Sequence, residues 1–457
     1  MSQTIQDPNQ PALRSATTSD VDVRALNVLV VHRYFWPDTP PVASILRSIC
    51  DSWADAGHDV SVYTSQPCYK PTVEIPRQPS RQTVGKLNVL RCWLPLEKSR
   101  NPLLRLMHFL MFLSFAFCHI VIRRKKYDLV MGLTFPPVIS GFVLSAAAKL
   151  RGSKFVYYCM DIHPESSTYT GKLKKGSIKA KIARTLDRRT CDSADAVVVL
   201  SQDMANTFLE RYKDAAGQVT PRLDAAKQKM HIISDFNPTS FGNEPSEVPS
   251  EFQRTPGKFR LVYAGNVGMF QALDNVVRAA QLLADQTDIE IVILGEGAAK
   301  KRLIEMAGDL NGKTVLFYPH QPVAVADKII QAADLAIVSL MPDVFRVAHP
   351  CKTSSYLAMG CPLLMVIEEE SRLYQMTVEN NLGYACRGEA PEALKETILT
   401  AYHNRDKIEA MREPAKLFAQ QHLVKEVQLV RWKNLINQLA QSLTDSNTKS
   451  SKLPRTA

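Results

Sequence analysis

Two glycine turns have the residue types and spacing of a phosphate-binding site. The apolar run 259–264 leads into Gly265-Asn-Val-Gly268, and a helical pattern follows over 271–284. Such a turn places backbone N–H groups at a helix N-terminus, where they favour an anion. A second turn, Leu294-Gly-Glu-Gly297, follows the next apolar run. Because either turn alone also fits an ordinary strand-to-helix connection, the hypothesis needs further residues.

Lys352 supplies a cation for the same chemistry. In His349-Pro-Cys-Lys352 a helical pattern begins near the lysine and ends at Gly360, which Pro362 follows shortly afterwards. An ammonium group at the N-terminal end of a helix can bind a diphosphate. The alternative interpretation of Lys352 is a solvated surface lysine without a ligand. We therefore predict a diphosphate site made of Gly265, Asn266, Gly268, Gly295, Gly297 and Lys352.

Alternating strands and helices must position these residues. This alternation runs through the first half of the chain and restarts in the second, which predicts α/β architecture with two doubly wound Rossmann-like domains facing across a cleft. Ligands in such sheets bind beyond the carboxyl ends of the strands. The expected strands are 27–32, 59–64, 87–93, 128–133, 154–161, 194–201 and 230–234, then 259–264, 289–294, 314–318, 334–339, 362–367 and 383–386.

The domain boundaries follow from length and composition. A chain of 457 residues is too long for one core. Its first residues are polar and rich in Pro, Ser and Thr, and they do not have the pattern of a signal peptide. The expected parts are a disordered leader (1–24), a first domain (25–240), a linker rich in turn formers (241–258), a second domain (259–420), a helix crossing back to the first domain (421–442) and a disordered tail (443–457).

Charge and cysteine content restrict the partners and the compartment. The chain carries a net charge of +11, and the whole excess lies in residues 1–235, which hold 32 Lys and Arg against 20 Asp and Glu. A one-sided basic balance indicates a polyanionic surface, and anionic lipid fits better than nucleic acid because no zinc-finger or RNA-binding signature is present. Nine scattered cysteines without a Cys-x-x-Cys pair indicate reduced thiols in a cytoplasmic protein.

One apolar segment, 103–122, is long enough to span a bilayer. Expected strands of one sheet lie on both sides of it, and a spanning helix would put them on opposite sides of the membrane. The cations Arg123-Arg-Lys-Lys126 follow directly. We predict a helix that dips into anionic lipid, and so a protein held peripherally at the inner face of the cell membrane. A helix buried against the sheet and a true span are the alternatives.

These motifs resemble the GT-B glycosyltransferases of family four, in the bacterial branch of colanic-acid type that assembles exopolysaccharide and O-antigen. The resemblance covers residues 27–440, and several ordered motifs make it specific. The similar segments are Asn27-Val-Leu-Val-Val-His-Arg-Tyr-Phe-Trp-Pro-Asp38, Ala56-Gly-His-Asp-Val60, Tyr157-Tyr-Cys-Met-Asp161-Ile-His163-Pro-Glu165, Tyr263-Ala-Gly-Asn-Val-Gly268-Met-Phe-Gln271, Pro350-Cys-Lys352 and Leu357-Ala-Met-Gly360-Cys-Pro362.

The resemblance implies a retaining, hexosyl-type transfer of sugar from a UDP- or GDP-sugar, without metal or cofactor. The clearest Asp-x-Asp, Asp20-Val-Asp22, lies in the leader and not at a strand end. A lipid-linked or polysaccharide acceptor would bind the first domain. Asp161 and His163 follow an expected strand there, and with Lys352 they are the catalytic candidates. His32 also ends a strand, although a lone histidine at such a place is more often structural.

The chain departs from the family at two acids. The family's Glu-x7-Glu pair, aligned on Lys352 and Gly360, falls on Val347 and Ser355. A serine can still bond a ribose hydroxyl, but without the charge assistance worth roughly 1–2 kcal/mol. Glu368–Glu370, just past the next strand, are either a substitute or an exposed acidic loop.

Three other functions remain open. Loss of both acids is compatible with a non-catalytic GT-B partner of another transferase. A GT-B sugar-nucleotide epimerase would not need the apolar helix. A dinucleotide oxidoreductase should have an acidic residue at the end of the second strand, where this chain has Leu294-Gly295.

Overall fold

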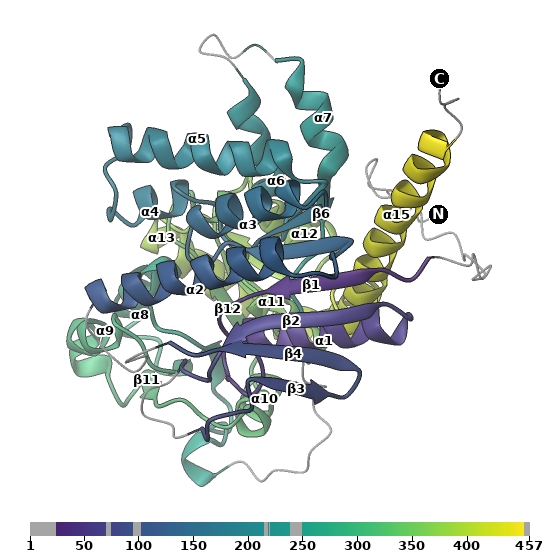
Figure 1. The fold of residues 1–457 in the computed structure, drawn as a ribbon. Helices are drawn as coiled ribbons and strands as arrows, with labels where there is room; N and C mark the ends of the chain where they lie inside the picture. The colour runs from purple at the N-terminus through teal and green to yellow at the C-terminus, as the bar shows by residue number, and fades with distance from the viewer. Residues whose placement is uncertain are drawn as a thin grey trace, which may run out of the picture.

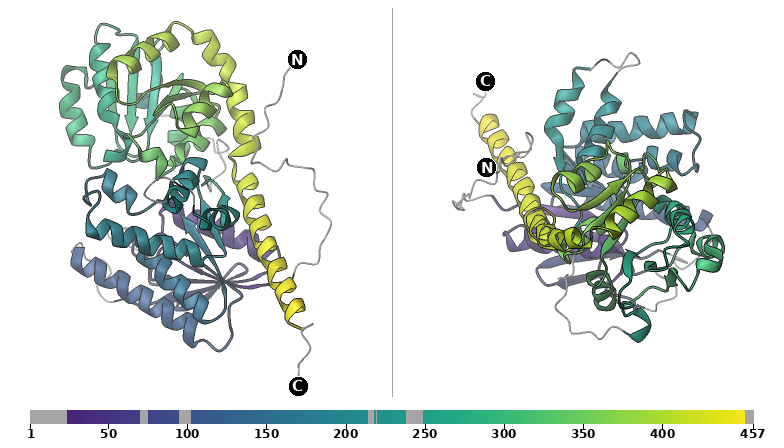
Figure 2. Two further views of the ribbon diagram at one scale, coloured as in Figure 1. Left: turned by 90° about the horizontal axis from the view of Figure 1, so that it is seen from above. Right: turned by 180° about the vertical axis from the view of Figure 1, so that it is seen from behind.

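The computed structural model describes residues 24–69, 75–94, 102–213, 218, 220–237 and 249–451. They form two α/β lobes joined near residues 238–248, and the lobes lie one against the other (Figures 1 and 2). The leader predicted at 1–24 falls almost wholly outside the described residues, as does the first part of the linker predicted at 241–258.

The first lobe is built on an eight-stranded sheet in the order β3-β4-β2-β1-β5-β6-β7-β8. Its strands are β1 (Asn27–Val31), β2 (Asp59–Ser65), β3 (Arg81–Val84), β4 (Leu87–Cys92), β5 (Leu129–Leu133), β6 (Lys154–Cys159), β7 (Ala196–Val199) and β8 (Met230–Ile232). Its helices are α1 (Pro41–Asp55), α2 (Pro102–Ile122), α3 (Ile139–Leu150), α4 (Glu165–Tyr169), α5 (Ile178–Ser193), α6 (Gln202–Leu209) and α7 (Arg222–Lys229), with a 3-10 turn η1 (Glu210–Tyr212).

The apolar runs of the sequence become the buried centre of this sheet. Every residue of β1, β5 and β7 is buried, as expected for parallel strands covered by helices on both faces. The exception is β3, which pairs antiparallel with β4 at the edge and has no buried residue. β3 is absent from the strands expected from the sequence because an exposed edge strand has no apolar run to mark it.

The second lobe has a six-stranded parallel sheet in the order β11-β10-β9-β12-β13-β14. The strands are β9 (Phe259–Ala264), β10 (Ile289–Leu294), β11 (Val315–Tyr318), β12 (Leu335–Ser339), β13 (Leu363–Val366) and β14 (Gly383–Cys386). The helices are α8 (Leu273–Leu282), α9 (Lys300–Ala307), α10 (Val323–Gln331), α11 (Lys352–Ala358), α12 (Arg372–Glu379), α13 (Pro391–Tyr402) and α14 (Arg405–His422), with 3-10 turns η2 (Ser250–Phe252), η3 (Met269–Gln271), η4 (Gly308–Leu310) and η5 (Val344–Arg346). The predicted doubly wound α/β fold is confirmed.

The last helix, α15 (Lys425–Ser451), leaves the second lobe and runs along the first (Figure 2). Trp432 lies in the core of the first lobe, where its ring packs edge-on against Trp53 and its carbonyl accepts a hydrogen bond from the indole of Trp53 at 3.2 Å. The helix continues past the predicted boundary at 442 and ends at Ser451. The prediction of a disordered tail from residue 443 is therefore wrong for residues 443–451. Residues 452–457 lie outside the described part.

The two lobes touch where strands of the first lobe end. The backbone N–H of Ile162, shortly after β6, donates to the carbonyl oxygen of Val347 at 2.9 Å. Asp161 and Ala348 form an antiparallel bridge beside it. Val347 is fully buried and packs into the core of the first lobe. The segment around residues 347–352 is therefore held directly opposite the carboxyl end of β6.

Helix α2 has one buried face and one exposed face. Phe112, Leu113 and Ala116 belong to the core of the first lobe, whereas Leu103, Leu106 and Leu110 are 67%, 47% and 45% exposed. None of the helices in the described part of the chain is both long and apolar enough to cross a membrane.

Candidate functional site

The two predicted glycine turns lie against each other at the carboxyl ends of β9 and β10. The backbone N–H of Gly265 donates to the carbonyl of Leu294 at 2.8 Å, and that of Val267 donates to Glu296 at 2.9 Å. A Cβ atom added to Gly295 would lie 1.9 Å from the carbonyl oxygen of Gly265, and one added to Gly297 would lie 2.2 Å from that of Val267. Both positions of the second turn must therefore be glycine for the turns to pack.

This packing corrects the predicted way in which the first turn would bind phosphate. The amides of Gly265 and Val267 already donate to the second turn, and that of Gly268 donates to the side chain of Gln271 at 3.1 Å. Helix α8 begins only at Leu273, after the turn η3. The expected row of unpaired amides running straight into a helix is therefore wrong for these three residues.

Lys352 lies directly on the first turn. A Cβ atom on Gly265 would lie 2.6 Å from Cε of Lys352 and 2.9 Å from its Nζ. The ammonium lies over the ring of Tyr263, 3.6 Å from the centroid, and bonds the Tyr263 hydroxyl. Tyr263 in turn donates to the carbonyl of Asn266 at 2.5 Å. The structure thus brings together Gly265, Asn266 and Lys352, which lie far apart in the sequence.

Lys352 is an amine without a counter-charge among the described residues. No carboxylate in the described part of the chain comes within ion-pair distance of its Nζ. Burial lowers the pKa of Lys352 to about 7, against the small opposing effect of the Cys351 thiol. A partly buried ammonium beside a glycine turn is suited to an anionic ligand, which would restore its charge.

The two positions aligned with the family's acids have different surroundings. Val347 is a core residue. Ser355 lies on α11, and its hydroxyl accepts a hydrogen bond from the side chain of Asn237, in the first lobe, at 3.5 Å. Glu368 accepts from the amide of Asp343 at 2.5 Å, and Glu370 pairs with Arg346 at 3.3 Å. These glutamates are engaged within the second lobe.

Asp161 faces this region from the first lobe, and Asp235 lies near it. Burial raises the pKa of each carboxyl group to about 6, and the charge of Asp161 adds to the effect on Asp235. Tyr158 donates a short hydrogen bond to Asp235. The sequence analysis missed Asp235, although an acid directly after the expected strand 230–234 was a usable signal.

His163 is held in place by a buried ionic network. Its carbonyl accepts from Arg211 at 2.8 Å, and Arg211 also pairs with Glu165 at 2.6 Å and with Asp187 at 2.5 Å. Burial lowers the pKa of His163 to about 4, so the ring is neutral at pH 7 and its Nδ1 lies 3.2 Å from the Ser167 hydroxyl. The network fixes the backbone that follows Asp161.

His32 is packed as a structural residue. Its Nδ1 lies 2.8 Å from the carbonyl of Tyr34, and burial lowers its pKa to about 4. Tyr34 and Phe135 pack beside the ring. The structure therefore places His32 at the carboxyl end of β1 with its Nδ1 already engaged.

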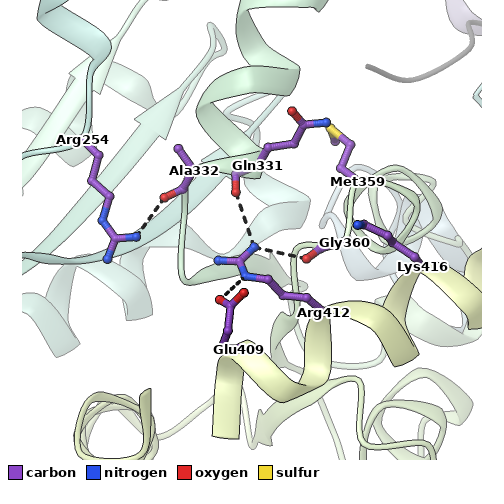
Figure 3. Close-up of a pocket in the computed structure, with 8 residues that line it drawn as sticks. All are labelled: Arg254, Gln331, Ala332, Met359, Gly360, Glu409, Arg412 and Lys416. Atoms are coloured by element: carbon purple, nitrogen blue, oxygen red, sulfur yellow. Dashed lines mark hydrogen bonds and ion pairs between the residues drawn. The ribbon is translucent and has the colours of Figure 1, made fainter. Parts of the chain in front are cut away.

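A cavity of about 520 Å³ lies at the other end of α11 and not beside Lys352. Arg412 lines it and donates to the backbone carbonyls of Gln331 and Gly360 (Figure 3). It also donates to the carbonyl of Ala333. Glu409 pairs with Arg412 at 2.8 Å, and Glu413 pairs with Lys416 at 2.9 Å. Because these cations already have partners, the cavity differs chemically from the Lys352 site.

Both lobes match known family models. Residues 42–221 match the glycosyl transferase 4-like domain, and residues 247–418 match the glycosyl transferases group 1. The chain belongs to the GT-B glycosyltransferases of family four. The two models confirm the predicted resemblance to this family, and the relatives described next confirm its colanic-acid type.

Relatives of this glycosyltransferase include a protein of Escherichia coli (strain K12) named "Putative colanic acid biosynthesis glycosyl transferase WcaI". The two are 25% identical over 393 residues, which are 83% of this chain and 94% of the relative. WaaG, a glycosyltransferase involved in lipopolysaccharide biosynthesis, has a similar solved fold, with a TM-score of 0.58, 16% identity and coverage of 89% of this chain and 98% of WaaG. Anabaena HepE, solved in complex with UDP, also has a similar fold, with a TM-score of 0.57 and 12% identity. The match covers 93% of this chain and 100% of HepE.

Proposed function

We propose that this glycosyltransferase moves a sugar, with retained anomeric configuration, from a nucleoside diphosphate-sugar to a lipid-linked acceptor in cell-surface polysaccharide synthesis. The observation that carries the proposal is the amine of Lys352, which lies against Gly265 and has no carboxylate partner among the residues that the structure describes. The relative WcaI, named for colanic acid biosynthesis, and HepE, solved with UDP, support the pathway and the donor class.

In this proposal Lys352 stabilises the leaving nucleoside diphosphate. Negative charge grows on the diphosphate as the sugar bond breaks, and a cation already in place needs no reorganisation at that moment. Neither a metal ion nor a cofactor is part of the proposed mechanism. Ser355 would contact the ribose, although its hydroxyl lacks the charge of the family's glutamate.

Asp161 would contact a hydroxyl of the acceptor or of the transferred sugar. Its raised pKa keeps it partly protonated near pH 6, so it can either donate or accept a hydrogen bond. His163 is neutral at pH 7 and can accept a proton or orient a hydroxyl. Retention would follow from attack on the face that the diphosphate leaves, with the departing phosphate taking the acceptor's proton.

The proposed location is the cytoplasmic face of the cell membrane. The exposed leucines of α2 and the cations at 123–126 match a surface that dips into anionic lipid. Such docking would present the first lobe to an acceptor anchored in the same bilayer.

A second candidate is a non-catalytic partner of another transferase, and the burial of Val347 where the family has an acid favours it. Calorimetric titration with UDP and GDP, together with a screen of nucleotide-sugar hydrolysis, separates the two. A catalyst binds one nucleotide, and Lys352→Ala weakens that binding about tenfold or more, the loss of a charge-assisted contact. No binding of either nucleotide, or an unchanged affinity in Lys352→Ala, overturns the donor assignment.

A further inference from the structure

The guanidinium of Arg33 is buried and has no hydrogen-bonding partner among the described residues. Arg33 follows His32 after β1, and only 3% of the residue is exposed. Its guanidinium lies over the ring of Phe109 on α2, 4.4 Å from the centroid. Its Nε is buried and unbonded, and within the described ranges no hydrogen bond or ion pair reaches the rest of the group. An arginine in this state is ready to bind an anion.

The surroundings of Arg33 leave a positive charge uncompensated. Asp38 is the carboxylate whose field reaches Arg33, and the same field acts on Arg91, which is also buried. Oδ1 of Asp38 accepts hydrogen bonds from the amides of Cys68 and Tyr69, both at 3.0 Å, and its buried Oδ2 makes no hydrogen bond, so no bond joins this carboxylate to Arg33. Arg91 donates to neutral groups. Two guanidiniums therefore share one carboxylate.

An apolar groove lies between α2 and α3. Leu110, Leu113 and Phe117 of α2 face Ile139 and Val143 of α3 across a groove of about 330 Å³. Leu110 is the neighbour of Phe109 in α2, and Ile139 is the first residue of α3.

Two aromatic rings pack together beside the cation. Phe135, which lies four residues before Ile139, packs edge-on against Phe109 with ring centroids 4.9 Å apart. The centroid of the Phe135 ring also lies 5.6 Å from that of the Tyr34 ring. The groove and the guanidinium are therefore linked through neighbouring residues of the chain, since Phe109 directly precedes the groove residue Leu110 on α2.

We propose that Arg33 and this groove form one binding site for a long-chain lipid phosphate. The guanidinium holds the phosphate, and the groove holds the hydrocarbon next to it. Charge complementarity decides this occupant, because an uncharged chain leaves Arg33 unpaired and a free phosphate leaves the groove empty. This proposal depends on the proposed function in one respect: it takes the lipid phosphate to be the carrier of the acceptor.

Equilibrium dialysis with labelled geranylgeranyl phosphate, geranylgeraniol and inorganic phosphate tests the site in the full chain. We expect the lipid phosphate to bind about tenfold or more tightly than the alcohol. Arg33→Met should lose this preference and keep the affinity for the alcohol. The control, Arg405→Met, removes a guanidinium that lies over Phe259 in the second lobe, and it should keep the preference.

Three results would overturn the proposal: no preference in the wild type, an unchanged preference in Arg33→Met, or inorganic phosphate bound as tightly as the lipid. Arg33→Lys guards against a folding defect, since it keeps the charge and should retain part of the preference if the chain folds. UDP titration of each variant is read separately. If UDP does not bind the wild type, the donor assignment is refuted. The proposed lipid phosphate site is refuted only by one of the three dialysis results above.

Discussion

The side chain of Lys352 occupies the space where Gly265 would carry a side chain. The two residues belong to different elements, α11 and the turn after β9, and a Cβ atom on Gly265 would lie 2.6 Å from Cε of the lysine. Gly265 also has a φ of +136°, a backbone conformation that residues with side chains rarely adopt. The position of the ammonium is thus fixed by the absence of a side chain on Gly265.

Gly265→Ala should therefore move Lys352 and weaken nucleotide binding. We expect a loss of about 1–3 kcal/mol in the free energy of unfolding from backbone strain, plus a fall in UDP affinity from the displaced ammonium. Gly312→Ala is the matched control, because Gly312 also has a positive φ but has no atom within 4 Å of an added Cβ. Urea denaturation and UDP titration of both variants check this. Equal UDP affinity in the two variants would contradict the argument.

UDP affinity should fall as the pH rises from 7 to 9. The pKa of Lys352 is about 7 in the free protein, and a bound diphosphate requires the ammonium form, so each pH unit above 7 costs up to about tenfold in affinity. The last ionisation of a phosphate has a pKa of about 6, below this pH range, and burial raises the pKa values of Cys351 and Tyr263 above their ordinary values. A change in UDP affinity between pH 7 and 9 therefore reflects the deprotonation of Lys352. In Lys352→Arg, the UDP affinity measured by calorimetry should not change between pH 7 and 9. The same decrease as in the wild type would show that Lys352 is not the group responsible.

The fold could be predicted further than the site. Apolar strand runs alternating with helices determine a doubly wound architecture, because only buried parallel strands need such runs. The contact of Gly265 with Lys352 could be proposed, since both lie at ends of adjacent elements. By contrast, the loss of free amides in the first turn depends on how Gly295 and Gly297 pack, and no local pattern encodes that. Arg33 is visible only once its burial and partners are known, whereas Asp235 could have been found as the acid directly after the expected strand 230–234.

Asp235→Asn should stabilise the protein at neutral pH. Burial raises the pKa of Asp235 to about 6, above the unfolded value near 4, so the folded state holds its proton and loses stability as the pH rises from 4 to 6. Removing the charge should recover up to about 2–3 kcal/mol at pH 7.5. Tyr158 can still donate to the amide oxygen.

Urea denaturation across pH 4–7.5 measures this effect. The variant's profile should be flatter than the wild type's, with a residual slope because Asp161 and Asp203 also have pKa values raised to about 6. The exposed control Asp309→Asn should change stability by no more than about 0.5 kcal/mol. An Asp235→Asn variant less stable than the wild type at pH 7.5 would contradict the prediction.

Arg211→Met should destabilise the first lobe strongly. Asp187 is as buried as the guanidinium, and Glu165 is mostly buried, so the substitution leaves carboxylates without their partner. Breaking such a group typically costs about 3–5 kcal/mol. The control is Arg222→Met, whose guanidinium is exposed and 3.8 Å from Asp192, with an expected change of about 1 kcal/mol or less. Equal losses in the two variants, measured in urea, would show that the network is dispensable.

Docking to anionic lipid should depend on the exposed face of α2. Wild-type protein should float with vesicles containing phosphatidylglycerol at low salt, and less so at 0.5 M salt because the attraction of the cations at 123–126 is screened, with a Debye length of only about 4 Å there. The double variant Leu106→Ser/Leu110→Ser removes two half-exposed leucines and should lower partitioning about tenfold or more, at roughly 1 kcal/mol for each leucine.

The comparison variant for this test is Leu417→Ser/Val430→Ser, which removes two side chains of similar exposure from α14 and α15. It should float like the wild type if the contact is local to α2, and it should lose binding equally if general surface hydrophobicity is responsible. Neutral vesicles isolate the charge contribution, because apolar insertion remains there and the attraction of the cations does not. Failure of the wild type to float with anionic vesicles at low salt would remove the membrane interpretation.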